Sequence, residues 1–119
     1  MAKILIVDDS RTSRRILRGI LEGAGHTIIE AVNGEDGYLK YKENSPDLVT
    51  MDITMPSMDG IEALQLIKKA DENAKVIMIT AAGQKEKMVS AIKHGAAEFL
   101  TKPYEDSHVL DIAARVLDA

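Results

Sequence analysis

Cysteine is absent from the sequence, which excludes disulfide bonds, thiolate zinc sites, iron–sulfur clusters and cysteine nucleophiles. Proline is scarce, with 3 residues, and there are only 8 glycines, so collagen-like repeats and disorder are disfavoured. The apolar run near the N-terminus covers only residues 4–7, which is too short for a signal peptide or a membrane span. We therefore expect a cytoplasmic protein without membrane insertion.

An excess of basic charge is also missing. The net charge is −4 with a sequence pI near 5.3, which argues against attraction of the whole chain to nucleic acid or anionic lipid. His26, His94 and His108 lack the spacing of metal ligands, and we assign them no role. The 119 residues, 45% hydrophobic and 29% charged, predict one monomeric domain over residues 1–119 with its own core.

Five short segments rich in β-branched residues recur along the chain. They cover residues 3–8, 26–31, 47–52, 75–80 and 98–102, and their composition predicts strands. Segments with the helical spacing of apolar residues lie between or after them, at 16–24, 61–67, 88–92 and 109–117. The sequence therefore predicts five successive strand–helix units.

Strands that are apolar on both faces and are joined by helices predict a parallel sheet covered on both sides. The expected fold class is α/β, a doubly wound five-stranded sheet with helices on both faces. Functional sites of such sheets lie at the carboxyl ends of the strands. The residues with reactive or special side chains at those ends are Asp8, Asp9, Asp52, Thr80, Thr101, Lys102 and Pro103.

Three carboxylates, those of Asp8, Asp9 and Asp52, are expected to converge at this edge. Like charges at such a distance repel unless a cation neutralises them. Only oxygen ligands are available, which favours a hard cation such as Mg²⁺. Lys102 and the Thr80 hydroxyl suit an anionic oxygen, and a carboxylate can be the nucleophile that forms an acyl phosphate.

The stretch TMPSMDG follows Asp52 and predicts a loop. Pro56 prevents further strand pairing and biases Met55 toward an extended backbone. Asp59 can cap a helix that starts at Gly60, and the backbone carbonyl of Thr54 can complete the coordination of a metal. Met55 and Met58 flank the loop and are candidates for contact with partners.

The motifs LIVDDS, NGEDG, PDLVTMDITMPSMDG, MITAAG and GAAEFLTKPY occur in this order over nearly the whole chain. With them the sequence resembles the response-regulator receiver domain and, within that family, the stand-alone chemotaxis regulators. The resemblance implies a flavodoxin-like sheet with strand order 2-1-3-4-5. Gly37 departs from the alanine usual in the second helix, at a cost of roughly 1 kcal/mol.

The resemblance also implies a role for each residue at the edge of the sheet. Asp52 is the implied phosphoacceptor, and Mg²⁺ is implied as the cofactor. The implied metal ligands are Asp9, Asp52 and the Thr54 carbonyl, with Asp8 acting through water. The implied contacts to the phosphoryl group are Lys102, Thr80 and the backbone N–H of Ala81.

A switch is implied as well, in which Thr80 moves toward the phosphate and the ring of Phe99 follows. Phe99 lacks the hydroxyl of the tyrosine found in some members, so contacts that need this hydroxyl are not carried over. The Lys102–Pro103 bond is cis in the family, which aims the ammonium at the phosphate.

The implied phosphodonor is a sensor histidine kinase, with small acyl phosphates as substitutes. Phosphorylation is implied to change the face formed by the segments at 88–92, 98–102 and 109–117, to which an output protein binds. A flagellar motor protein is the first expectation for this partner, and a phosphatase is a further candidate. Such a domain promotes its own phosphorylation and dephosphorylation, but it acts as a signalling switch.

Several alternatives stay open at this point. A phosphorelay intermediate or an isolated receiver of a larger regulator would carry the same motifs. A haloacid-dehalogenase-like phosphatase also uses an aspartyl phosphate, but it needs a second Asp where this chain has Thr54. A flavin-binding electron carrier needs a phosphate loop rich in Ser, Thr and Gly, whereas the segment after the first strand is acidic.

Single features also have simpler interpretations. Asp8 and Asp9 alone could end a strand and cap a helix, and Thr80 alone could be an ordinary strand residue. A basic patch formed by Arg11, Arg14, Arg15 and Arg18 is by default a solvated helix face, and the alternative is a docking surface for an acidic partner.

Overall fold

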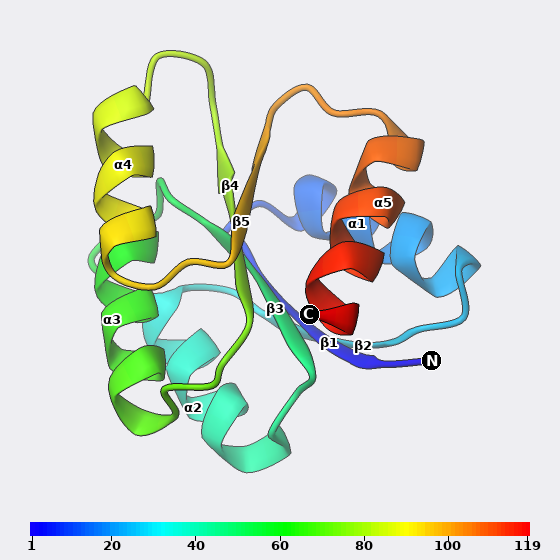
Figure 1. The fold of residues 1–119 in the computed structure, drawn as a ribbon, viewed down its shortest axis with the longest axis horizontal. Coiled ribbons are helices and arrows are strands. Elements are labelled where there is room, and N and C mark those ends of the chain that lie inside the picture. Colours follow the sequence, from blue (N-terminus) through cyan, green and yellow to red (C-terminus); the bar gives the residue numbers. More distant parts are fainter.

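The computed structural model describes residues 1–119 and has ten elements in strict alternation (Figure 1). The strands are β1 (Lys3–Val7), β2 (Thr27–Ala31), β3 (Leu48–Asp52), β4 (Val76–Thr80) and β5 (Glu98–Thr101). The helices are α1 (Arg11–Gly23), α2 (Gly34–Asn44), α3 (Gly60–Ala70), α4 (Lys85–Lys93) and α5 (Asp106–Asp118). The predicted strands agree with these bounds to within one residue at each end.

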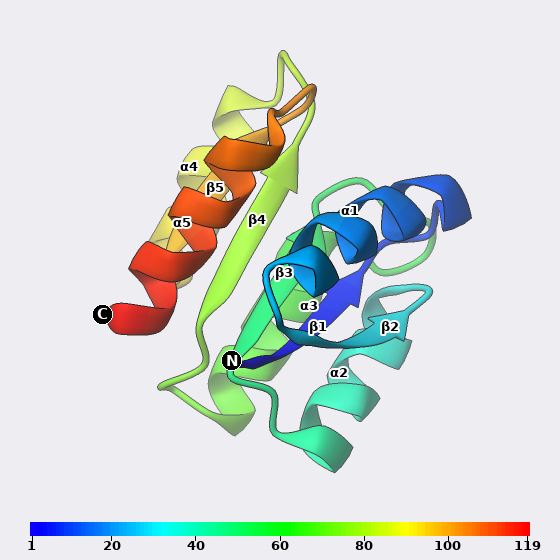
Figure 2. The ribbon, with the colours of Figure 1, turned by 90° about the vertical axis from the view of Figure 1, so that its right-hand side faces the viewer.

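All neighbouring strands pair in parallel, in the order β2-β1-β3-β4-β5. Figure 2 shows the strand arrowheads directed toward one edge of the molecule. The predicted fold class and the strand order implied by the resemblance are both confirmed. The chain winds outward from β1 to β2 and then returns to β3, so the winding direction reverses between β1 and β3, where ligands bind in sheets of this kind.

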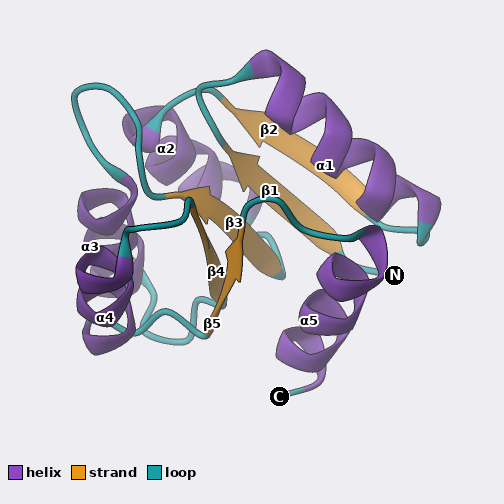
Figure 3. Cartoon of the chain, turned by 90° about the horizontal axis from the view of Figure 1, so that it is seen from above, coloured by secondary structure: helices purple, strands orange, loops and turns teal.

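Two apolar layers enclose the sheet. Helices α2, α3 and α4 cover one face and α1 and α5 cover the other (Figure 3). Every residue of β3 and β4 is buried, as expected for central strands covered on both faces. No helix is both long enough and apolar enough to cross a lipid bilayer.

Helix α2 packs against β1 through an unusual surface, because its buried residues are Gly34, Gly37 and Tyr41. A Cβ atom at Gly37 would lie 2.8 Å from Cγ2 of Val7. Val7 is fully buried and β-branched, so it has little freedom to move away. The glycine therefore permits close contact between α2 and the sheet, which offsets its low helix propensity.

Candidate functional site

Asp8, Asp9 and Asp52 lie together beyond the carboxyl ends of β1 and β3. One carboxylate oxygen of each residue lies within 4.8 Å of those of the other two. Asp8 and Asp52 are buried, whereas Asp9 is exposed to solvent. The predicted convergence is confirmed, and the cluster could hold a metal ion.

A single ammonium group faces this cluster. Lys102 Nζ lies 3.2 Å from Asp52 Oδ2 and 3.8 Å from Asp8 Oδ2. Burial raises the pKa of the Asp8 carboxyl, and the charges of Asp52 and Asp9 raise it further. The hydrogen bond from the Ser10 N–H and the charge of Lys102 lower this pKa, but the net shift is upward. The site therefore has more negative charge than one lysine can compensate. An oxygen-only donor set, with Asp9 open to solvent, fits a hard divalent cation.

Lys102 follows β5 directly and extends the sheet ladder, since its backbone N–H donates to the Thr80 carbonyl at 2.8 Å. The Lys102–Pro103 bond is cis. Burial lowers the pKa of Lys102, but attraction to Asp52 and Asp8 outweighs this effect and the net shift is upward. Lys102 is therefore a stable positive charge beside the carboxylates.

The loop after β3 holds the backbone of Asp52 against the start of α3. The Gly60 N–H donates to the Ile53 carbonyl at 2.8 Å, and a Cβ at Gly60 would overlap the Asp52 carbonyl oxygen. Only glycine permits this approach. Asp59 caps α3 as predicted, because its side chain accepts from the Glu62 N–H at 2.9 Å.

One expectation for this loop is wrong. Met55 was a candidate for contact with partners, but only 7% of it is exposed and it packs in the core on the α2–α3–α4 side. Met58 is partly buried and packs against the same cluster. Thr54, by contrast, is exposed, and its N–H donates to Asp52 Oδ1 at 3.3 Å.

The hydroxyl of Thr80 is engaged by a residue that the sequence did not single out, Gln84. The Thr80 hydroxyl lies 2.9 Å from Gln84 Oε1 and 3.1 Å from the Ala81 carbonyl. The Ala81 N–H also donates to Gln84 Oε1, at 2.8 Å. The available signal was weak: Gln84 stands where a helix usually begins with Ser, Thr, Asp or Asn.

Comparison with known proteins identifies the family. The model of the response regulator receiver domain matches residues 4–114. The chain belongs to the response regulator receiver domain family. It is 49% identical to the chemotaxis protein CheY of Halobacterium salinarum, with all of both chains covered. It is 46% identical to the CheY of Thermotoga maritima, over 96% of each chain. Among solved structures, the receiver domain of NtrX from Brucella abortus matches with a TM-score of 0.94 and 34% identity, over 98% of each chain.

Phe99 of this receiver domain lies in β5, in register with Met78 of β4 and two positions before the Thr80–Thr101 pair. Its side chain is partly buried and packs against the core on the α2–α3–α4 side. It also lines a cavity between β5 and α5 together with Pro103 and Tyr104. The ring is therefore anchored on one side and accessible on the other.

The four arginines of the expected basic patch on α1 do not form a uniform surface. Arg14 and Arg18 pair with Glu30 of β2 at 2.9 and 2.6 Å, and Arg14 also donates to the Asp8 carbonyl at 2.7 Å. Of the four, Arg11 and Arg15 are exposed, whereas Arg14 and Arg18 are partly buried. Arg14 therefore supports the segment that carries the acidic cluster.

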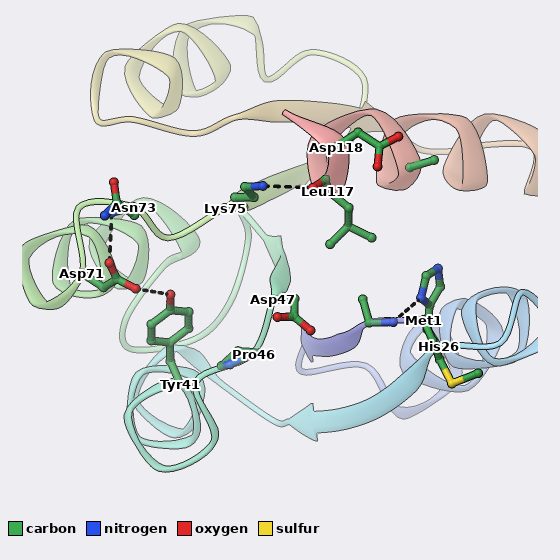
Figure 4. Close-up of a pocket in the computed structure, with 12 residues that line it drawn as sticks. Met1, His26, Tyr41, Pro46, Asp47, Asp71, Asn73, Lys75, Leu117 and Asp118 are labelled. Carbon is green, nitrogen blue, oxygen red and sulfur yellow. Dashed lines mark hydrogen bonds between the residues drawn. The ribbon is translucent and has the colours of Figure 1, made fainter.

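A cavity of about 590 Å³ lies at the opposite end of the sheet (Figure 4). Its polar groups are largely paired within the protein: the Tyr41 hydroxyl donates to Asp71 at 2.8 Å, and Lys75 donates to the Leu117 carbonyl at 3.1 Å. His26 accepts from the Ala2 N–H at 3.1 Å. The aspartates that line this cavity are not close enough to one another to hold a metal ion together, whereas Asp8, Asp9 and Asp52 are. We therefore take the acidic edge as the site.

Proposed function

We propose that this receiver domain is a phosphorylation-activated switch of a two-component system and that Asp52 is its phosphoacceptor. The observation that carries the proposal is the buried Asp52 carboxylate, 3.2 Å from the Lys102 ammonium and next to two further carboxylates. A buried carboxylate with a lysine beside it and room for a cation is suited to accept an anionic group.

In the proposed reaction an oxygen of Asp52 attacks the phosphorus of a phosphohistidine of a sensor kinase. The O–P bond of the acyl phosphate forms and the P–N bond breaks. The histidine leaves as a neutral imidazole, because the phosphohistidine already carries a proton on its other ring nitrogen. With a small acyl phosphate as donor, a P–O bond breaks instead. Lys102 remains next to the phosphoryl oxygens and stabilises their charge. Attack of water on the phosphorus later regenerates Asp52 and releases inorganic phosphate.

We assign Asp9, Asp52 and the Thr54 carbonyl as the residues that hold Mg²⁺, with Asp8 acting through water. The oxygen-only donor set and the excess of negative charge support this choice of metal. The bound ion supplies neutralisation of the phosphoryl charge. The residues themselves bring the nucleophile and the ligands to one edge of a rigid sheet.

We assign the phosphoryl contacts to Lys102, Thr80 and the Ala81 N–H, and the switch to Thr80 and Phe99. Support comes from the position of both switch residues on the adjacent strands β4 and β5. Movement of the Thr80 side chain toward the phosphate would free space along β4 for the ring of Phe99. The changed face of α4, β5 and α5 then binds an output protein.

The relatives named as chemotaxis proteins support a role in chemotaxis, with a flagellar motor protein as output partner and the cytoplasm as location. The match to the NtrX receiver supports a second candidate, the receiver of a larger regulator or a relay intermediate. A pull-down with and without beryllium fluoride and Mg²⁺ distinguishes them. Mimic-dependent capture of a motor protein supports the first, and mimic-dependent capture of a histidine phosphotransfer protein supports the second.

The phosphoacceptor assignment is tested with acetyl phosphate. In Mg²⁺ the intact protein should gain the mass of one phosphoryl group, and EDTA should prevent the gain. Asp52→Asn should show no gain in mass. Asp111 is an exposed aspartate on α5, so the control Asp111→Asn should gain the same mass as the unsubstituted protein. Equal phosphorylation of Asp52→Asn would exclude the assignment.

A further inference from the structure

Gln84 connects the two loops that border the acidic cluster. It directly precedes α4, yet its side chain makes no capping hydrogen bond to that helix. Its Oε1 accepts from the Ala81 N–H at 2.8 Å and from the Thr80 hydroxyl at 2.9 Å. Its Nε2 donates to the Thr54 hydroxyl at 2.6 Å. One side chain therefore bridges the loop after β4 and the loop after β3.

The orientation of the Gln84 amide follows from the chemistry of its partners. The Ala81 N–H is only a donor, so the atom that it contacts must be the amide oxygen. The amide nitrogen then faces Thr54, whose hydroxyl oxygen accepts. Both polar atoms of the side chain have partners, and the side chain is held in place by three separate contacts.

We propose that Gln84 is a latch for the unphosphorylated state. Its amide oxygen accepts hydrogen bonds from the Thr80 hydroxyl and the Ala81 N–H. These are the same two donors that we assign to the phosphoryl group. The inference rests on the proposed function, because it takes both donors as phosphoryl contacts. Each donor has one hydrogen, so Gln84 Oε1 and a phosphoryl oxygen compete for it, and phosphorylation releases Gln84.

Release of Gln84 connects the site to α4. Since Gln84 is the residue immediately before Lys85, the first residue of α4, loss of its contacts to Thr80 and Ala81 frees the N-terminal end of the helix. Gln84 is thus a positioning residue. It acts on the reacting group only through the donors that it holds, and it shifts the equilibrium toward the unphosphorylated form.

The test compares Gln84→Leu with Gln65→Leu, the same substitution at an exposed position of α3 where the side chain has no hydrogen bond. Beryllium fluoride with Mg²⁺ is the probe. Gln84→Leu should bind it about fivefold to tenfold more tightly, the ratio for about one net hydrogen bond. Gln65→Leu should bind it with the affinity of the unsubstituted protein.

A second measurement needs neither metal nor phosphate. Amide hydrogen exchange at Ala81 should become faster in Gln84→Leu, because the N–H loses its acceptor. Gln84→Glu keeps an acceptor oxygen and should restore the protection of this amide. A general structural role for Gln84 would not produce this rescue at one N–H. Thermal unfolding establishes that each variant is folded.

The outcomes separate the latch from the proposed function. Faster exchange at Ala81 together with tighter probe binding supports the latch. Equal or weaker binding by folded Gln84→Leu, or unchanged exchange at Ala81, overturns the latch while binding by the unsubstituted protein still supports the phosphoacceptor. If no variant binds the probe, the proposed function fails and the latch fails with it.

Discussion

Asp8→Asn should stabilise the metal-free protein while impairing metal binding. Asp8 is buried, and its carboxylate belongs to a cluster in which three ligand oxygens lie within 4.8 Å of one another. The substitution removes one of the three negative charges. The Oδ1 atom of asparagine can still accept the 2.8 Å hydrogen bond from the Ser10 N–H.

The size of the effect follows from these distances. At an effective dielectric constant of about 20, each like-charge pair at the cluster distance costs about 3 kcal/mol, and the attraction between Asp8 and Lys102 returns about 4 kcal/mol. Asp8 has two such like-charge neighbours, of which Asp9 is exposed and screened by solvent. With Asp9 screened, these Coulomb energies nearly cancel. The variant also avoids the desolvation of a buried carboxylate, which is the main cause of the raised pKa of Asp8, so we expect a net gain of about 1 to 2 kcal/mol, or roughly 3 to 8 °C in Tm.

The pH dependence has a defined sign. Burial and the charge of Asp52 raise the pKa of Asp8 above its ordinary value of 3.8, so the folded state binds this proton more tightly than the unfolded state. Ionised Asp8 therefore lowers stability above its folded-state pKa. The Tm advantage of Asp8→Asn should be largest at neutral pH and should shrink as the pH falls toward about 4.

The assay is thermal unfolding in EDTA and in excess Mg²⁺. Mg²⁺ should raise the Tm of the unsubstituted protein, as any ligand of the folded state does, and should raise that of Asp8→Asn far less. Asp111→Asn is the control and should match the unsubstituted protein in both buffers. A Tm of Asp8→Asn below that of the unsubstituted protein in EDTA would refute the repulsion that we assign to the cluster.

Four further substitutions test separate parts of the structure. Thr50→Val should raise the free energy of unfolding by about 1 kcal/mol, and with it the Tm, because the Thr50 hydroxyl is buried without a hydrogen-bond partner; a lower Tm would contradict this. Gly37→Ala should lower stability by about 1 kcal/mol or more through overlap with Val7, whereas the open site at Gly19 should gain about 0.5 kcal/mol or more from the same change. A raised Tm for Gly37→Ala would show that the contact is not limiting. Lys102→Met should slow labelling by acetyl phosphate about 100-fold, measured by intact mass over time, and an unchanged rate would remove the lysine from the site.

The sheet and its reactive edge were predictable because their signals are local. Strands apolar on both faces and joined by helices are typical of a covered parallel sheet, and the carboxyl ends of parallel strands fall on one edge whatever the exact packing. Asp8, Asp9, Asp52 and Lys102 could thus be brought together before any coordinates. Strand order came from the resemblance, since apolar runs such as β3 and β4 do not indicate their neighbours.

Other features depend on tertiary contacts that no local pattern contains. The packing surface of α2 includes Gly34 and Gly37, which give no hydrophobic stripe. The sequence alone predicts that Arg14 belongs to a solvated helix face. Its ion pair with Glu30 depends on the position of β2 beside α1. Gln84 is an ordinary polar residue in sequence, and its contacts arise from the path of the loop between β4 and α4.

The most direct measurement of the central claim is chemical mapping of the modified residue. After treatment with acetyl phosphate and Mg²⁺, reduction with borohydride should convert an aspartyl phosphate to homoserine, which peptide mass spectrometry locates. We expect homoserine at position 52 alone, and none when Mg²⁺ is replaced by EDTA. Homoserine at another aspartate, or no conversion in a folded protein, would contradict the account.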